Sequence, residues 1–125
     1  MAGRRAGRRT ALFLLYQWDV TGQPLTSLYE GEVDEFAREL AEAVCARAPE
    51  LDAVITAAAE GWTADRLGAV ERNVLRIDTY ELETGSVPPE VAINEAVELA
   101  KRYATEDAAR LVNGILGRIA RERVS

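Results

Sequence analysis

The chain has 125 residues, of which 48% are hydrophobic and 29% are charged, and its net charge is −6. This length accommodates one domain with a single core, and the composition excludes wholesale disorder. We therefore expect one domain over residues 1–125, with residues 1–3 flexible. The first nine residues hold four arginines and no acid, so the remainder carries −10. Such an acidic body would hold a polyanion only through local basic patches.

Apolar residues recur at helical spacing along almost the whole chain, and alternating runs rich in β-branched residues are missing. The pattern predicts an all-α fold of about six or seven helices. The first helix covers about residues 4–20 and ends at Gly22. The other predicted helices cover about residues 25–29, 33–47, 49–61, 63–85 with a break at Gly68, 88–104, and the segment that begins at Thr105.

Two glycines, Gly114 and Gly117, lie inside the last predicted helix. Glycine at such a position costs about 1 kcal/mol relative to alanine. The close approach of a second helix would account for this cost. We therefore expect another helix to pack against these two residues.

The sequence offers little material for catalysis. Histidine is absent, which removes the commonest general base and metal ligand, and the single cysteine, Cys45, lies among apolar residues at helical spacing. The chain has no P-loop and no G-x-G-x-x-G motif, and its paired carboxylates fall on polar helix faces. We expect no enzyme activity, no catalytic residue, no metal site and no cofactor.

The chain shows no convincing signal for export or membrane insertion. The stretch RRTALFLL is similar to a twin-arginine signal, but its apolar run from Ala11 to Tyr16 is shorter than the roughly 7–15 residues of a secretory segment. No stretch approaches the ~20 apolar residues that span a membrane. A single cysteine cannot form an internal disulfide, which favours a reducing compartment. We expect a cytoplasmic protein without a membrane segment.

The first helix places Arg5, Arg9 and Tyr16 on one face, about 150° from its apolar stripe. Single-stranded RNA is bound by such a combination, because phosphates pair with arginine while a base stacks on the aromatic ring. The same residues also suit a solvated helix end, with Tyr16 packed against a neighbouring helix. This helix alone leaves both interpretations open.

The second half of the chain carries a more specific pattern. It contains DRLGAVERNVLRIDTYEL, then VAINEAVELAK at residues 91–101, and then VNG at residues 112–114. In this order, after an arginine-rich first helix, these motifs resemble the NusB family of transcription antitermination factors. The resemblance extends from Arg4 to Ile119, nearly the whole chain.

The resemblance implies two packed helical bundles and a non-enzymatic, RNA-binding function. Proteins of this family bind the boxA element of nascent ribosomal RNA transcripts together with the small-subunit ribosomal protein NusE. The complex helps RNA polymerase to read through terminators and supports ribosomal RNA synthesis. An acidic body also suits a basic ribosomal protein as partner. The resemblance leaves open whether the chain is a monomer or a homodimer.

The resemblance also assigns positions to the binding surface. The RNA-binding positions that it implies are Arg4, Arg5, Arg8, Tyr16, Arg76 and Arg110, and the face of the first helix adds Arg9. It places Glu71, Asp107 and Leu111 on the surface shared by RNA and partner. Leu111 stands where the family usually has phenylalanine, so an aromatic contribution is missing at that position.

Two other functions compete with this one. A NusB-like helical domain also forms the N-terminal part of some ribosomal RNA cytosine methyltransferases, which continue into a catalytic domain. The chain could also be a protein–protein adapter whose arginines are merely solvated. Affinity for RNA in the absence of any partner would distinguish the adapter.

Overall fold

The computed structural model describes residues 3–124, and every regular element in this range is helical. In chain order these are α1 (Arg4–Thr21), η1 (Leu25–Leu28), α2 (Glu35–Ala46), α3 (Ala48–Ala58), η2 (Ala64–Arg66), α4 (Ala69–Thr84), α5 (Pro89–Tyr103) and α6 (Glu106–Val124), where η marks a short 3₁₀ helix. The all-α prediction is confirmed, including the break at Gly68. Residues 1 and 2, for which we expected flexibility, lie outside the described range, whereas Gly3 is the N-cap of α1.

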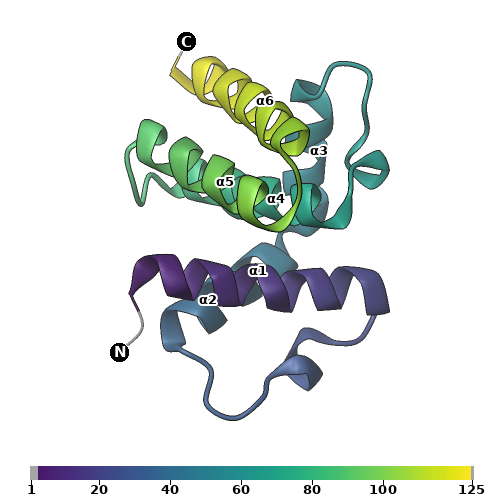
Figure 1. Cartoon of the computed structure of the whole chain (residues 1–125), viewed down its shortest axis with the longest axis vertical. Helices are drawn as coiled ribbons and strands as arrows, with labels where there is room; N and C mark the ends of the chain where they lie inside the picture. Colours follow the sequence, from purple (N-terminus) through teal and green to yellow (C-terminus); the bar gives the residue numbers. More distant parts are fainter. Residues whose placement is uncertain (1–2, 125) are drawn as a thin grey trace.

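The helices form two groups, with α4 between them. Helices α1 and α2 lie together with the loop that holds η1, at the bottom of Figure 1, and α3, α5 and α6 lie on the other side of α4. Helix α4 packs against each of the other five α-helices. The arrangement agrees with the two packed bundles that we expected from the sequence.

The ends of several helices are determined by capping residues that can be recognised in the sequence. Gly22 and Gly85 adopt left-handed conformations, with φ of 73° and 67°, and their N–H groups donate to Trp18 O and Glu81 O. These two glycines therefore end α1 and α4 in the way that favours glycine over any residue with a Cβ. At the other ends, Asp34 accepts a hydrogen bond from Ala37 N and begins α2, and Thr105 accepts one from Ala108 N and begins α6.

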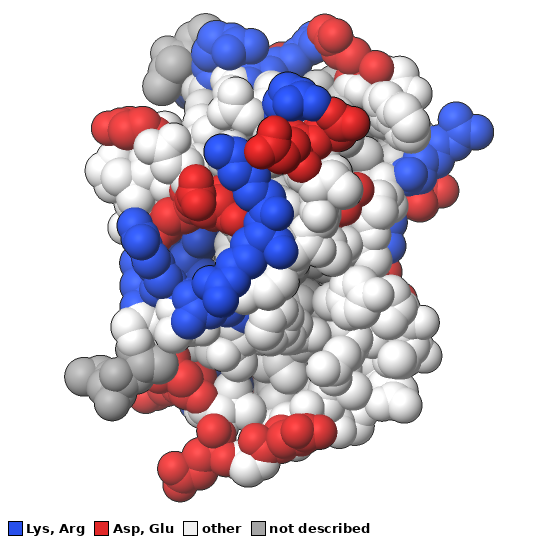
Figure 2. All heavy atoms as spheres, viewed as in Figure 1, with Lys and Arg blue, Asp and Glu red and all other residues white. Residues whose placement is uncertain are grey.

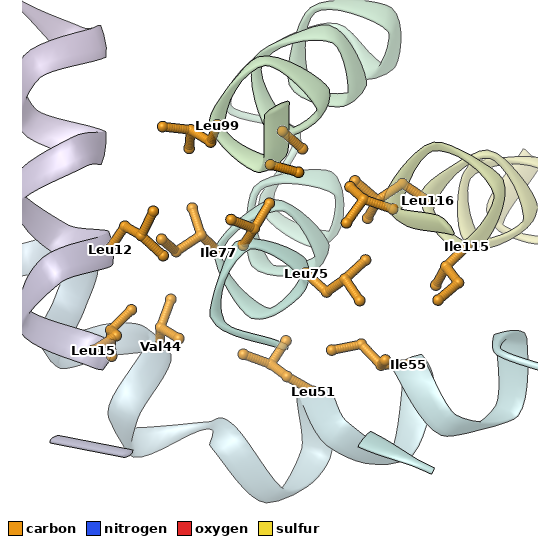
Figure 3. Packing of buried hydrophobic residues seen from close by; sticks show 14 of the residues in the cluster. Leu12, Leu15, Val44, Leu51, Ile55, Leu75, Ile77, Leu99, Ile115 and Leu116 are labelled. Atoms are coloured by element: carbon orange, nitrogen blue, oxygen red, sulfur yellow. The ribbon is translucent and has the colours of Figure 1, made fainter. Parts of the chain in front are cut away.

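Helix α4 is buried on every side. Its residues from Asn73 to Leu82 are all buried except Tyr80. Figure 3 shows Ile77 pointing toward Leu12 of α1, while Leu75 points toward the other side, where α3 and α6 pack. A helix without a solvent-exposed stripe is a central core helix, and α4 therefore sets the positions of the helices around it.

One glycine permits the close packing of α1 and α2, and it is not one that we singled out from the sequence. A methyl group at Gly7 would lie 2.5 Å from Phe36 Cδ2 and 3.3 Å from Asp34 Oδ2. A methyl group at Gly114, by contrast, would meet no atom within 4 Å apart from its own helix backbone. At Gly117 it would meet only Arg121 of the same helix, at 3.4 Å. The expectation that a helix packs against Gly114 and Gly117 is therefore wrong.

Alanine substitutions at Gly7 and Gly114 should have opposite effects on stability. Gly114→Ala should raise the free energy of unfolding by up to about 1 kcal/mol, because alanine favours the helix and the space is open. Gly7→Ala should lower it by about 1–3 kcal/mol, because the new methyl group displaces the Phe36 ring. Urea unfolding of both variants measures the difference, and equal stabilisation by both would show that Phe36 moves aside without cost.

Candidate functional site

The four arginines at the start of α1 divide into two pairs with different environments. Arg4 and Arg8, one turn apart, point toward carboxylates of α4 and α5. Arg5 and Arg9, also one turn apart, make no ion pair among the described residues. Since each residue advances about 100° around a helix, the two pairs lie on adjacent faces of α1.

The inward pair forms a buried ionic cluster. Arg8 is only 2% exposed, and its guanidinium donates to Asp78 Oδ1 at 2.5 Å and to Glu81 Oε1 at 3.1 Å. Arg4 donates to Glu81 Oε2 at 2.5 Å. The carboxylate of Glu95 in α5 lies 3.5 Å from Arg4 and 3.6 Å from Arg8. Three helices, α1, α4 and α5, are thus joined by charges that water does not reach freely.

The cluster also shifts the protonation equilibria of its members. Burial raises the pKa of the Asp78 carboxyl well above its ordinary value, against the opposing charge of Arg8, and the nearby Glu81 and Glu95 raise it further. Burial alone would lower the pKa of Arg8, but the charges of Asp78, Glu81 and Glu95 together raise it. Arg8 therefore stays charged, and its charge is matched within the protein. Arg8 lies in the interior, although the family resemblance placed it with the residues that face RNA.

The outward pair lines a groove. Arg5 and Arg9 of α1 and Arg102 of α5 border a groove of about 380 Å³. Figure 2 shows basic side chains gathered over the left part of the face, where α5 and the beginning of α1 lie in Figure 1, with acidic side chains beside them. Arg102 contacts the ring of its neighbour Tyr103 at 5.4 Å and makes no ion pair among the described residues. Three guanidinium groups are therefore available to an anion in this groove.

Exposed aromatic rings continue the same helix beyond the arginines. Tyr16 is 40% exposed, as the face prediction requires, and Phe13 is also exposed. The Phe13 ring meets Tyr103 of α5 edge to face, with centroids 5.1 Å apart. The alternative in which Tyr16 packs its ring into a neighbouring helix is not what the structure shows. Tyr16 is open to a stacking partner.

Arg76 also lies in the interior, where the family resemblance had suggested a binding position. It is 6% exposed and makes two hydrogen bonds of 2.7 Å to the carboxylate of Asp52 in α3. It also donates to Asp19 at 3.3 Å and lies over the Trp18 ring at 5.5 Å. Arg76 therefore ties α4 to α3 and α1 and does not present its charge to a ligand.

The remaining predicted residues lie on other parts of the surface. Asp107 and Arg110 are exposed and form an ion pair with each other. Arg110 and Leu111 line a second groove of about 660 Å³, between α6 and the segment after α3 that carries the exposed Trp62. The Glu71 carboxylate lies at the start of α4, in space left free because Gly68 has no side chain. Arg5, Arg8 and Arg9 thus share one groove, and Arg110 and Leu111 share another.

Sequence reasoning missed Arg102 and Trp62. Arg102 follows Lys101 in the last turn of a helix, and basic residues there are expected simply because they complement the helix dipole. Trp62 follows Gly61 in a turn, where no helical period places it on a face. Arg102 could have been identified from its spacing, because Asn94, Glu98 and Arg102 are four residues apart and form a row on α5.

The described part of the chain gives no sign of a metal centre or a membrane segment. Within residues 3–124, no group of three or more His, Cys, Asp or Glu side chains is arranged to hold a metal ion. None of the described helices combines the length and apolar character that crossing a bilayer requires. The candidate binding surfaces are the two grooves lined by α1 and by α6, because predicted site residues line both of them.

The six-helix fold and its arginine-lined groove define an all-helical protein with a surface suited to anions. The sequence pattern of the NusB family matches residues 5–121. The chain therefore belongs to the NusB family of transcription antitermination proteins, which is a non-enzymatic family.

Individual relatives are similar to this chain in sequence and structure over most of its length. It is 45% identical over 120 residues to the transcription antitermination protein NusB of Rubrobacter xylanophilus, covering 90% of this chain and 86% of that protein. A crystal structure of T. maritima NusB matches with a TM-score of 0.86 and 37% identity, covering 97% of this chain and 92% of that one. A crystal structure of the antitermination factors NusB and NusE in complex with dsRNA matches with a TM-score of 0.81 and 31% identity, covering 95% and 96%.

Replacing Arg8 should destabilise the fold far more than replacing Arg5. Arg8→Met leaves the buried carboxylate of Asp78 without its ionic partner and leaves Glu81 paired with Arg4 alone, a change that typically costs about 3–5 kcal/mol. Arg5→Met, the control, removes the same charge from an exposed site and should change the free energy of unfolding little. Urea unfolding measures both.

A further variant tests whether the unpaired Asp78 carboxylate is the cause. Adding Asp78→Asn to Arg8→Met should recover part of the lost stability, because residue 78 is then neutral while Glu81 still pairs with Arg4. Equal stabilities of Arg8→Met and Arg5→Met would contradict a stabilising role for the ionic cluster.

Proposed function

We propose that this chain binds boxA-type single-stranded sequence in nascent ribosomal RNA transcripts, together with the ribosomal protein NusE. By doing so within the antitermination complex, it promotes read-through by RNA polymerase in the cytoplasm. Residues 1–125 act as one RNA-binding domain in this proposal. The observation that carries it is the pair Arg5 and Arg9, which have no carboxylate partner among the described residues of an acidic chain.

The geometry divides the proposed residues by role. Arg5, Arg9 and Tyr16 contact RNA directly, because two unpaired guanidinium groups and an exposed ring lie along one helix. Arg4, Arg8 and Arg76 are positioning residues, because their guanidinium groups are held by carboxylates of the protein. Phosphate contacts hold RNA without reading its sequence, and stacking adds affinity for any base.

The second groove supports the partner in the proposal. Leu111 and Trp62 offer apolar contacts there, and Asp107 beside it is exposed and acidic. Glu71 and Arg110 belong to the same proposed surface. A related structure that contains NusB, NusE and dsRNA supports both kinds of partner for this fold.

The salt dependence of RNA binding tests the arginine pair. For single strands, the slope of log affinity against log salt is about −0.7 per neutralised phosphate, so Arg5→Ala with Arg9→Ala should flatten the slope by about 1.4. Arg66→Ala with Arg123→Ala is the control, because these exposed arginines line neither of the two grooves. Titration of labelled boxA-type RNA at several salt concentrations gives the slopes.

Tyr16→Ala in the same titration separates stacking from charge. It should weaken binding by about 1–3 kcal/mol and leave the slope unchanged, because no counterion is released at a stacked base. Circular dichroism of each variant confirms that the helices are intact. Unchanged affinity and slope in the folded arginine variant would mean that α1 is only a solvated helix end and that RNA is bound elsewhere on the chain.

Partner binding is tested separately at the second groove. A NusE protein should co-elute with this chain on a sizing column at micromolar concentration. Leu111→Asp should weaken the pair by more than about 1 kcal/mol, because it puts a charge into an apolar contact. Glu30→Lys, a charge change in the loop after η1, is the control and should have no such effect. Absence of co-elution with the unaltered chain would contradict NusE as the partner.

A further inference from the structure

The α1–α5 groove has walls of mixed chemistry. Its volume of about 380 Å³ falls within the roughly 300–1,000 Å³ of sites that bind small molecules. Arg5 and Arg9 border it on α1, whereas Val91 and Leu99 contribute apolar surface from α5. A groove of this kind can hold a phosphate and the flat face of a ring at the same time.

The α5 wall also carries polar groups that the protein itself does not use. Asn94, Glu98 and Arg102 are four residues apart and therefore form a row along α5. Asn94 and Glu98 are exposed and make no hydrogen bond or ion pair within the described part of the chain. Their amide and carboxylate are thus free to bond to a ligand.

A deeper carboxylate in the same wall lacks a hydrogen bond. Glu95 lines the groove, and its side chain is 12% exposed. Its Oε1 atom is buried and accepts no hydrogen bond among the described residues, since Arg4 and Arg8 approach it only to 3.5 and 3.6 Å. Buried polar atoms are nearly always hydrogen-bonded. The α5 wall therefore favours a ligand that brings hydrogen-bond donors.

We infer that this groove binds one nucleotide of the RNA, with its phosphate on Arg5 and Arg9 and a guanine base against α5. The inference rests on the RNA binding proposed above. Guanine presents two neighbouring donors, N1–H and the 2-amino group, on its Watson–Crick edge, and a carboxylate such as Glu98 accepts both. Uracil presents a single N–H between two carbonyl oxygens, which a carboxylate repels.

The base preference is measured with two short RNAs. One is a uridine oligomer, and the other is the same oligomer with a single central guanosine. The guanosine-containing oligomer should bind at least about tenfold more tightly, since hydrogen bonds to a charged group are worth that ratio or more. A third oligomer with inosine at that position, which lacks the 2-amino donor, should bind with intermediate affinity. Fluorescence anisotropy at fixed salt gives the affinities.

Glu98→Gln tests whether the Glu98 carboxylate recognises guanine. The measured quantity is the affinity for the guanosine-containing oligomer divided by the affinity for the uridine oligomer. In this variant the ratio should fall toward one. Glu90→Gln, which removes the same charge from α5 outside the groove, should keep the ratio of the unaltered chain. An equal rise in affinity for both oligomers in Glu98→Gln would show that the carboxylate only repels phosphate, and it would overturn the inference.

The remaining outcomes separate this inference from the function on which it rests. Equal binding of both oligomers by the unaltered chain, with the salt slope that Arg5 and Arg9 produce, would overturn the guanine site and leave the proposed RNA binding intact. Failure to bind either oligomer, by a chain whose circular dichroism is helical, would overturn the RNA binding and the guanine site together.

Discussion

The buried ion pairs between α1 and α4 are the constraint on which the rest of the structure depends. Helix α4 is enclosed on all sides, yet it carries Arg76, Asp78 and Glu81 in its buried stretch. Moving an ion out of water costs several kcal/mol unless an opposite charge is close. The surrounding helices must therefore supply those charges, which α1 does with Arg8 and α3 does with Asp52. Packing and charge together therefore fix the orientation of α1 about its own axis.

The orientation of α1 determines which of its arginines are free to bind a ligand. Because Arg8 turns inward to Asp78 and Glu81, its helical neighbours Arg5 and Arg9 turn outward into the groove. A third side of α1 approaches α2 so closely that only glycine fits at residue 7. Three faces of α1 thus have different environments: one packs into the core, one packs against α2, and one borders the groove. A stability requirement inside the protein fixes the charge pattern on its surface.

The sequence predicted the helices well and the environments of the arginines poorly. Helix periods and ends depend on residues close in the chain, such as Gly22 and Gly85, and these are visible without a structure. The burial of Arg8 depends on Asp78, seventy residues away, and an apolar-polar pattern treats any arginine as surface. Gly114 shows the same limit, because its cost to the helix can be recognised in the sequence, whereas the open space around it cannot.

The ionic cluster also positions α5, the helix that forms the second wall of the groove. Two of the four arginines that open α1 are matched by carboxylates, so the basic start of the helix presents less charge to a polyanion than its sequence suggests. Arg102 of α5 adds a third guanidinium to the groove, and its distance from α1 depends on how α5 is held. Glu95 provides that link, because it lies on α5 and faces both Arg4 and Arg8. The candidate anion-binding surface of this acidic protein is thus assembled from two helices, and the Glu95 carboxylate between them keeps its three arginines around one groove.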